Sequence, residues 1–161
     1  MVPAQPSRST QAERGSTLIE FTLVLLPTMA ILLMIIDLAW ALFAQVTLQE
    51  AVREGVRFAV VGQSDAAIRQ RVTQYAFGFV KDASSAGPVG VHYFAQANPT
   101  VELAPSVVGS NCAGNIVKVT IAGISISPMG PLWRSAAALN LGAVSADIVE
   151  PGVQGSNCPA R

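Results

Sequence analysis

Residues 21–43 read FTLVLLPTMAILLMIIDLAWALF, and this stretch decides the fold class. Asp37 is its only ionisable residue. At ~1.5 Å per residue a helix of this length reaches roughly 35 Å, enough to cross a hydrocarbon core of about 30 Å. A buried core helix is the alternative, but this almost uninterrupted apolar stretch leaves no polar face for water. The stretch therefore predicts a transmembrane or export segment.

Pro27 lies inside this predicted helix and removes one backbone hydrogen bond. Transmembrane helices tolerate proline when another group satisfies the freed carbonyl. We expect the hydroxyl of Thr28, or another subunit, to do so. Trp40 and Phe43 lie near the far end, where aromatic residues form belts at membrane surfaces.

The composition agrees with a membrane segment. Of 161 residues 51% are hydrophobic and only 12% are charged, whereas about a quarter of an ordinary soluble domain is charged. Ten Lys and Arg balance ten Asp and Glu. This balance argues against a basic nucleic-acid binder, and the hydrophobicity argues against disorder.

The helical pattern continues beyond the apolar stretch. One stripe of apolar residues recurs at helical spacing: Leu48, Val52, Val56 and Ala59. We therefore expect one helix from Ser16 to Val61, with Gly62 as its C-cap. Two i,i+3 pairs are expected on its solvent-exposed side, namely Glu50 with Arg53 and Glu54 with Arg57.

A second helix and a sheet are expected after Gly62. Ser64 is a suitable N-cap, with Asp65 in the first turn. The apolar face of this helix comprises Ile68, Val72, Tyr75 or Ala76, and Phe79. From Val89 the period changes to two, in segments around residues 89–93, 101–103, 117–121, 124–126 and 144–148, with Gly123 at a change of parity that suggests a bulge. The sequence thus predicts an α+β fold: a long N-terminal transmembrane helix extending into a stalk, a second helix and a small antiparallel sheet.

The two cysteines, Cys112 and Cys158, both follow the apolar stretch and lie in Gly-, Asn- and Pro-containing loops. An even pair after an export-type segment favours a disulfide, and hence an oxidising compartment. Two unpaired thiols are the alternative.

The junction before the apolar stretch, residues 14–25, reads RGSTLIEFTLVL and places Glu20 just inside the helix. A carboxylate in a membrane helix is costly and is a functional candidate by default. Thr17 and Glu20 also have the T-x-x-E spacing of a capping box, which would explain the glutamate without any function.

This junction resembles the processing site of type IV-type prepilins, in which a prepilin peptidase cuts after a glycine and the fifth mature residue is glutamate. The cut would fall between Gly15 and Ser16, so that Glu20 is the fifth mature residue. Glu20 would then neutralise the new α-amino group of Ser16, in its own chain or a neighbouring one, and set the register of stacked helices.

The stretch over roughly residues 14–62 is similar to the TadE-like family of tight-adherence (Flp) pilus assembly proteins. The positions that carry the resemblance are Gly15, Glu20, Phe21, Pro27, Asp37 and the run from Ala51 through Arg57. Pro27 comes one residue later than is typical, and Trp40 stands where a basic residue is typical. We expect Asp37 at the outer interface, with pairing to another subunit as the alternative.

The resemblance implies a pilin-like minor pseudopilin: a leader over residues 1–15, a transmembrane and stalk helix over 16–61 and a periplasmic α+β domain over 62–161. It implies a single pass through the bacterial inner membrane with a cytoplasmic N-terminus. The implied partners are the prepilin peptidase, other pilins, the inner-membrane assembly platform and membrane lipid, with no nucleic acid.

The sequence offers little for catalysis, so we expect no enzyme, cofactor or metal site. His92 is the only histidine and has no acidic neighbour at useful spacing. No phosphate-binding loop or nucleophile elbow occurs. Two other functions stay open: an exported soluble domain released at Ala39–Trp40–Ala41, and an unprocessed single-span anchor of an external binding domain.

Overall fold

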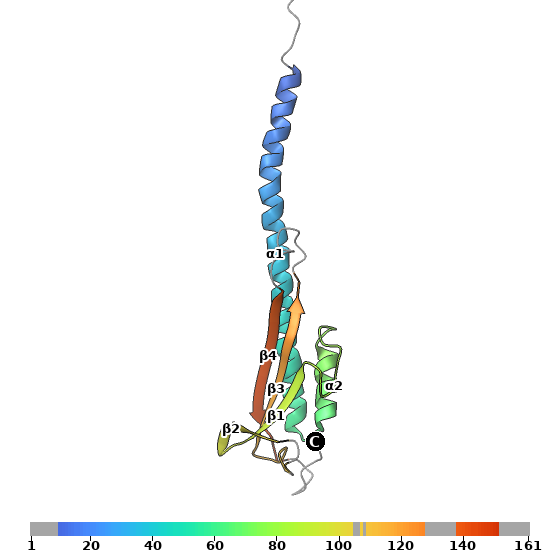
Figure 1. Cartoon of the computed structure of the whole chain (residues 1–161), viewed down its shortest axis with the longest axis vertical. Helices are drawn as coiled ribbons and strands as arrows, with labels where there is room; N and C mark the ends of the chain where they lie inside the picture. Colours follow the sequence, from blue (N-terminus) through green and yellow to red (C-terminus); the bar gives the residue numbers. More distant parts are fainter. Residues whose placement is uncertain (1–9, 105–106, 108, 128–137, 152–161) are drawn as a thin grey trace, which may run out of the picture. The chain divides into compact units, whose positions relative to one another are not determined.

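The computed structural model describes residues 10–104, 107, 109–127 and 138–151. In chain order the elements are the helices α1 (Thr10–Val60) and α2 (Asp65–Tyr75), then the strands β1 (Val89–Ala95), β2 (Asn98–Leu103), β3 (Ile116–Ile126) and β4 (Leu139–Ile148). Figure 1 shows these elements along the chain. The predicted α+β arrangement, a long apolar helix followed by a short helix and an antiparallel sheet, is confirmed.

The chain divides into two units. Of the described residues, one unit holds those up to Ala39, and the other holds those from Trp40 onward. Helix α1 therefore contributes to both, with its apolar N-terminal part in the first unit and its residues from Trp40 onward in the second.

Helix α1 has 51 residues and passes through Pro27 without a break. It starts earlier than the predicted Ser16 and ends one residue before the predicted Val61. The end matches the predicted cap, because Gly62 has φ of 79° and its N–H donates to the Ala59 carbonyl at 2.9 Å.

Helix α2 begins as predicted. Ser64 is its N-cap, and the Ser64 hydroxyl accepts from the Ala67 N–H at 3.4 Å. Asp65 lies in the first turn but is buried, 3.9 Å from Arg69 one turn later. Of the two residues left open for the apolar face, Ala76 is buried and Tyr75 is half exposed.

The sheet has the order β2-β1-β3-β4, and every neighbouring pair is antiparallel. Side chains that alternate along β1 and β3 are buried and pair across the strands, as in Val91 with Val119 and Tyr93 with Val117. The predicted irregularity at Gly123 is confirmed, because the register of β3 against β4 shifts between Ile121 and Ile124 and Gly123 has φ of 76°.

One core holds the second unit together. In this core the apolar stripe of α1 packs with α2 and the buried face of the sheet. The fully buried residues of the core include Leu48, Val52, Ile68, Val72, Val89, Tyr93, Val117 and Val119. The C-terminal part of α1 is thus a core element of a folded unit. Along β1 and the first half of β3 the alternate side chains are only partly buried, as a period of two requires, whereas β2 is exposed almost throughout.

Candidate functional site

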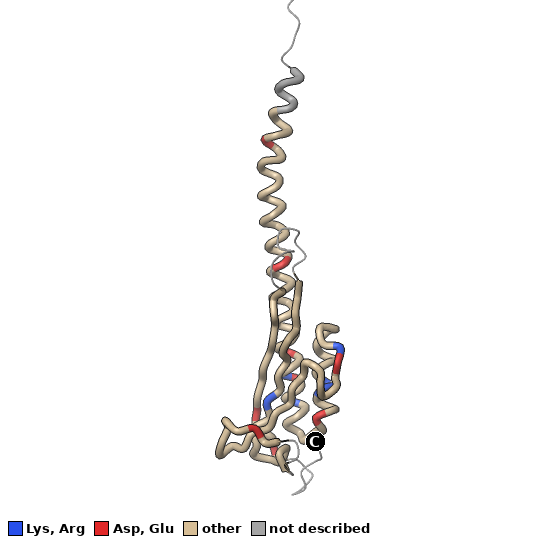
Figure 2. Tube along the Cα trace, in the orientation of Figure 1, with Lys and Arg blue, Asp and Glu red and all other residues tan. Residues whose placement is uncertain are grey.

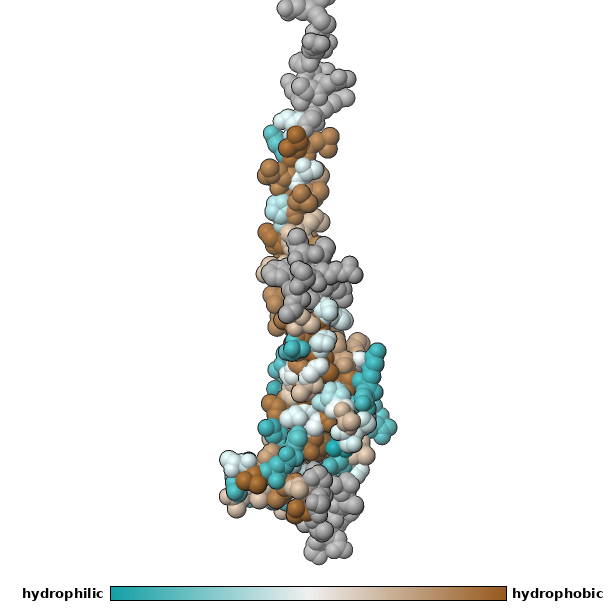
Figure 3. All heavy atoms as spheres, viewed as in Figure 1, coloured by the Kyte–Doolittle hydropathy of each residue, from teal (hydrophilic) through white to brown (hydrophobic). Residues whose placement is uncertain are grey.

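The N-terminal part of α1 presents apolar side chains on all sides. Ile19, Leu23 and Leu26 are 68%, 69% and 70% exposed. Figure 3 shows this part of α1 as hydrophobic surface, and Figure 2 shows that charged residues gather in the second unit. Among the described residues α1 is the one helix long and apolar enough to cross a membrane, and its most apolar part is not buried within the structure. Such a surface needs lipid or other apolar helices around it.

Two threonines in the apolar part of α1 donate their hydroxyl groups to backbone carbonyls of the same helix. Thr22 donates to the Ile19 carbonyl at 2.9 Å, and Thr28 donates to the Val24 carbonyl at 2.7 Å. The carbonyl freed by Pro27 is that of Leu23, four residues earlier. The expectation that Thr28 satisfies the freed carbonyl is therefore wrong, because its hydroxyl bonds the next carbonyl along the helix.

Glu20 lies exposed in the middle of this apolar surface, five residues after Gly15. Because α1 begins at Thr10, both Thr17 and Glu20 lie inside the helix. They do not cap a helix start in the uncut chain, which removes the capping-box explanation for Glu20 there. Asp37, the second carboxylate of the stretch, is half-buried.

Gly55 lies where α1 meets α2. A Cβ atom built on Gly55 would overlap Cγ2 of Val72 and lie 3.5 Å from Cγ1 of Val119. Val72 is fully buried and branched at Cβ, so it has little freedom to move aside. Glycine at this position therefore allows the two helices and the sheet to approach closely.

Glu54 connects the same two helices through an ion pair. Arg71 of α2 donates from Nη2 to Glu54 Oε1 at 2.9 Å, and its guanidinium carbon lies 4.7 Å from the centre of the Tyr75 ring. The hydrogen bond to Glu54 raises the pKa of Arg71 above its ordinary value. The expected pair of Glu54 with Arg57 is thus wrong, since α2 supplies a better-placed partner. The expected pair of Glu50 with Arg53 is present at 3.8 Å, in an exposed position where it adds little stability.

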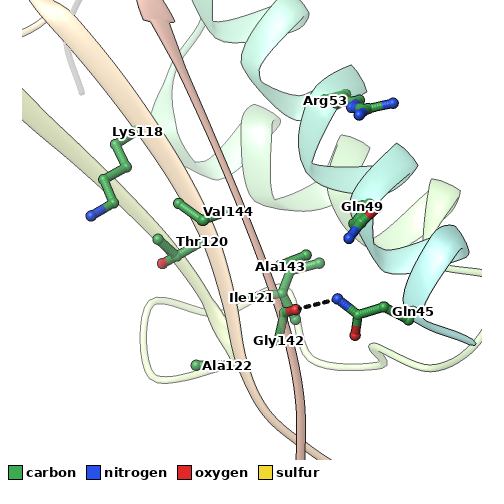
Figure 4. Close-up of a pocket in the computed structure, with 10 residues that line it drawn as sticks. All are labelled: Gln45, Gln49, Arg53, Lys118, Thr120, Ile121, Ala122, Gly142, Ala143 and Val144. Atoms are coloured by element: carbon green, nitrogen blue, oxygen red, sulfur yellow. Dashed lines mark hydrogen bonds between the residues drawn. The ribbon is translucent and has the colours of Figure 1, made fainter. Parts of the chain in front are cut away.

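A shallow groove of about 620 Å³ lies between α1 and the strands β3 and β4. Gln45 closes one end of it, where Nε2 donates to the Gly142 carbonyl at 3.0 Å. Figure 4 shows the charged ends of Arg53 and Lys118 pointing away from each other across the groove. No carboxylate, histidine or cysteine is among the residues that line it. The groove therefore offers no acid–base pair for catalysis.

His92 has an acidic neighbour that the sequence did not reveal. Its Nδ1 lies 2.6 Å from Glu102 Oε1 on the adjacent strand β2, and both side chains are partly exposed. The expectation of an isolated histidine is therefore wrong, because the pairing of β1 with β2 brings the two residues together. Within the described ranges no three His, Cys, Asp or Glu residues gather to hold a metal ion.

Cys112 is half-buried in the turn region before β3, next to the buried Asn111. Cys158 lies outside the described residues. The disulfide between them stays a prediction.

Comparison with known proteins bears on the N-terminal part of the chain. Residues 15–57 match the family model described as TadE-like protein. This segment is TadE-like. The match begins at Gly15 and ends at Arg57, so it contains every position on which the resemblance depended. Neither the curated proteins nor the solved structures gave a match.

The TadE-like segment covers two structurally different parts of α1: the exposed apolar helix and the run from Ala51 to Arg57. The second part is where α2 docks, through Gly55 and Glu54. The segment supports a part for this protein in tight-adherence pilus assembly, and its apolar helix supports a single-pass membrane anchor.

Replacing Gly55 by leucine is expected to lower the free energy of unfolding by about 1–3 kcal/mol, because the added side chain overpacks the contact with Val72. Chemical unfolding in detergent, followed by near-ultraviolet circular dichroism, measures the change. Gln49→Leu is the control, since Gln49 is exposed on the same helix. A Gly55→Leu chain as stable as the Gln49→Leu chain would show that the contact tolerates a side chain.

A double variant sharpens this test. Val72→Ala alone destabilises the unit, because it leaves a cavity at a fully buried site. Combined with Gly55→Leu it makes room for the added side chain, so the double variant is expected to be more stable than the sum of the single changes predicts. Strict additivity would mean that Gly55 and Val72 do not share one contact.

The importance of Gly55 was missed from sequence although a signal exists. A glycine inside a strongly helical pattern usually has a packing or functional reason. The partner helix, however, is known only once α2 is placed on α1. Arg71 was missed for the same reason, because nothing in the sequence pairs it with Glu54.

Proposed function

We propose that this protein is a membrane-anchored minor pseudopilin that takes part in assembling a tight-adherence pilus. The observation that carries the proposal is the coincidence of the TadE-like segment with a helix whose apolar surface is exposed all round. In this role the apolar part of α1 lies in the inner membrane among other pilin helices and lipid. The second unit lies in the periplasm, and the leader lies in the cytoplasm.

The proposed role includes processing by a prepilin peptidase between Gly15 and Ser16. The cut creates an α-amino group at Ser16, four residues before Glu20. A positive amine in an apolar environment needs a negative partner, and Glu20 is the nearest carboxylate in the sequence after the cut. The pair forms within one chain or between neighbours and sets the register of the packed helices.

The proposed role is structural and not enzymatic. The sequence carries no catalytic motif, and the groove beside α1 is lined by two amides, two cations, one hydroxyl group and otherwise by glycine and apolar side chains. The partners are then other pilins or pseudopilins, the inner-membrane assembly platform and the peptidase that trims the leader.

N-terminal sequencing of the mature protein, extracted from the membranes of cells that contain the peptidase, tests the proposal. We expect the mature chain to start at Ser16. A start at Leu42 would instead indicate a soluble domain released by signal peptidase after Ala41. A start at or near Met1 would indicate a plain single-span anchor. Either of these results would overturn the processing step.

A further inference from the structure

Four aromatic rings cluster where the apolar stretch of α1 ends. Trp40 and Phe43 come from α1, whereas Phe77 and Phe79 come from the turn that follows α2. The ring centres of Trp40 and Phe79 lie 5.9 Å apart, and those of Phe43 and Phe77 lie 6.0 Å apart. The tertiary structure thus brings a second, short segment to the level of the aromatic end of the apolar helix.

The fold keeps the side chain of Phe77 exposed to solvent. It is 76% exposed, more than any other large apolar side chain that the structure describes. Its φ of 49° lies in the left-handed region, which a bulky residue adopts only when its surroundings impose it. Both ends of the turn are anchored, since Ala76 and Val80 are buried and the Phe79 N–H donates to the Ala76 carbonyl at 2.9 Å. The exposed position of Phe77 is therefore a built feature of the turn.

The neighbouring part of α1 indicates what covers this ring. After Asp37 the next charged residue on α1 is Glu50, so Trp40 and Phe43 lie on an uncharged part of the helix. Leu42 and Val46, on the same part, are 58% and 62% exposed. This surface continues the apolar stretch along α1. Aromatic rings at the end of an apolar helix are typical of the boundary between lipid headgroups and acyl chains.

We propose that the turn from Ala76 to Val80 is a second membrane contact, in which Phe77 inserts into the boundary region of the bilayer beside Trp40 and Phe43. The exposed Lys81 follows at once and suits the adjacent phosphate headgroups. The contact holds the second unit at the membrane surface. The proposal rests on membrane anchoring by α1 and does not depend on a role in pilus assembly.

Depth-dependent fluorescence quenching tests the contact in the full-length chain. The chain is placed in phosphatidylcholine–phosphatidylglycerol nanodiscs, with and without phosphatidylcholine brominated in the upper acyl chain. Phe77→Trp is introduced into a chain that also carries Trp40→Phe and Trp133→Phe, so that one indole reports. The matched control places the indole in the sheet, as Val101→Trp in the same background, because Val101 is 57% exposed on β2.

We expect quenching of the Phe77→Trp chain to exceed that of the Val101→Trp chain by at least about twofold, as for a ring roughly 5–10 Å below the surface. A chain with only Trp133→Phe reports on Trp40 and shows whether α1 itself is inserted. If Trp40 is quenched while Phe77→Trp and Val101→Trp behave alike, the turn does not touch lipid, and a second protein subunit is the better occupant. If Trp40 is not quenched, the anchor is absent and the proposal fails with it.

Discussion

Replacing Gly15 by alanine is expected to leave the full-length chain uncut. Prepilin-type processing takes place after a glycine, and an added methyl group at that position obstructs the peptidase. The uncut chain also lacks the α-amino group at Ser16, so Glu20 has no new cation to neutralise. Intact-mass measurement of the membrane fraction, in cells that contain the peptidase, is expected to find only the uncut species.

The control for this experiment is Ser16→Ala, which keeps Gly15 and changes the other side of the proposed bond. We expect it to be trimmed like the unaltered chain. If the Gly15→Ala chain is trimmed normally, the cut lies elsewhere and the assignment to Gly15 is wrong. If both variants stay uncut, the peptidase requires Ser16 as well as Gly15. That result still supports the requirement for Gly15.

Replacing Glu20 by glutamine is expected to permit processing but to prevent assembly. Glutamine keeps the size of the side chain and removes the charge that neutralises the Ser16 amine. Removing one partner of a buried ion pair costs about 3–5 kcal/mol. Since about 1.4 kcal/mol is a tenfold change in an equilibrium, we expect incorporation to fall by roughly a hundredfold or more. Co-purification of the chain with other pilus subunits from detergent-solubilised membranes measures it.

The matched control for Glu20 is Glu50→Gln on the same helix. The Glu50 side chain is 64% exposed in its pair with Arg53, so we expect assembly to be unaffected. Equal assembly of the Glu20→Gln chain and the control would show that the carboxylate has no pairing role. In that case a local capping role at the new helix start after processing is the better explanation.

Local patterns in the sequence were sufficient for the elements of this fold. The run of apolar residues from Phe21 predicted the long helix, and Ser64 followed by Asp65 predicted the start of α2. The alternation around Val117 and the interruption at Gly123 predicted β3 and its irregularity. These features depend on neighbours close in the chain, namely helix periodicity, capping and the alternation of a strand.

These local patterns did not predict the contacts between helices and strands that are distant in the chain. The sequence suggested Arg57 for Glu54, but Arg71 of α2 is its partner. It suggested no partner for His92, but Glu102 of β2 lies beside it. Both errors have one cause: a local rule considers only charges at short spacing in the chain, whereas packing brings a distant charge closer.

The sequence by itself therefore determined the apolar helix with Glu20 and Asp37, and the TadE-like pattern that the family model also matches over residues 15–57. These are properties of one continuous segment. Only the tertiary structure decided why Gly55 is a glycine and where Phe77 lies. The first depends on Val72 of another helix, and the second on a turn whose ends are buried in a shared core. Both result from long-range packing, which a pattern of neighbouring residues does not encode.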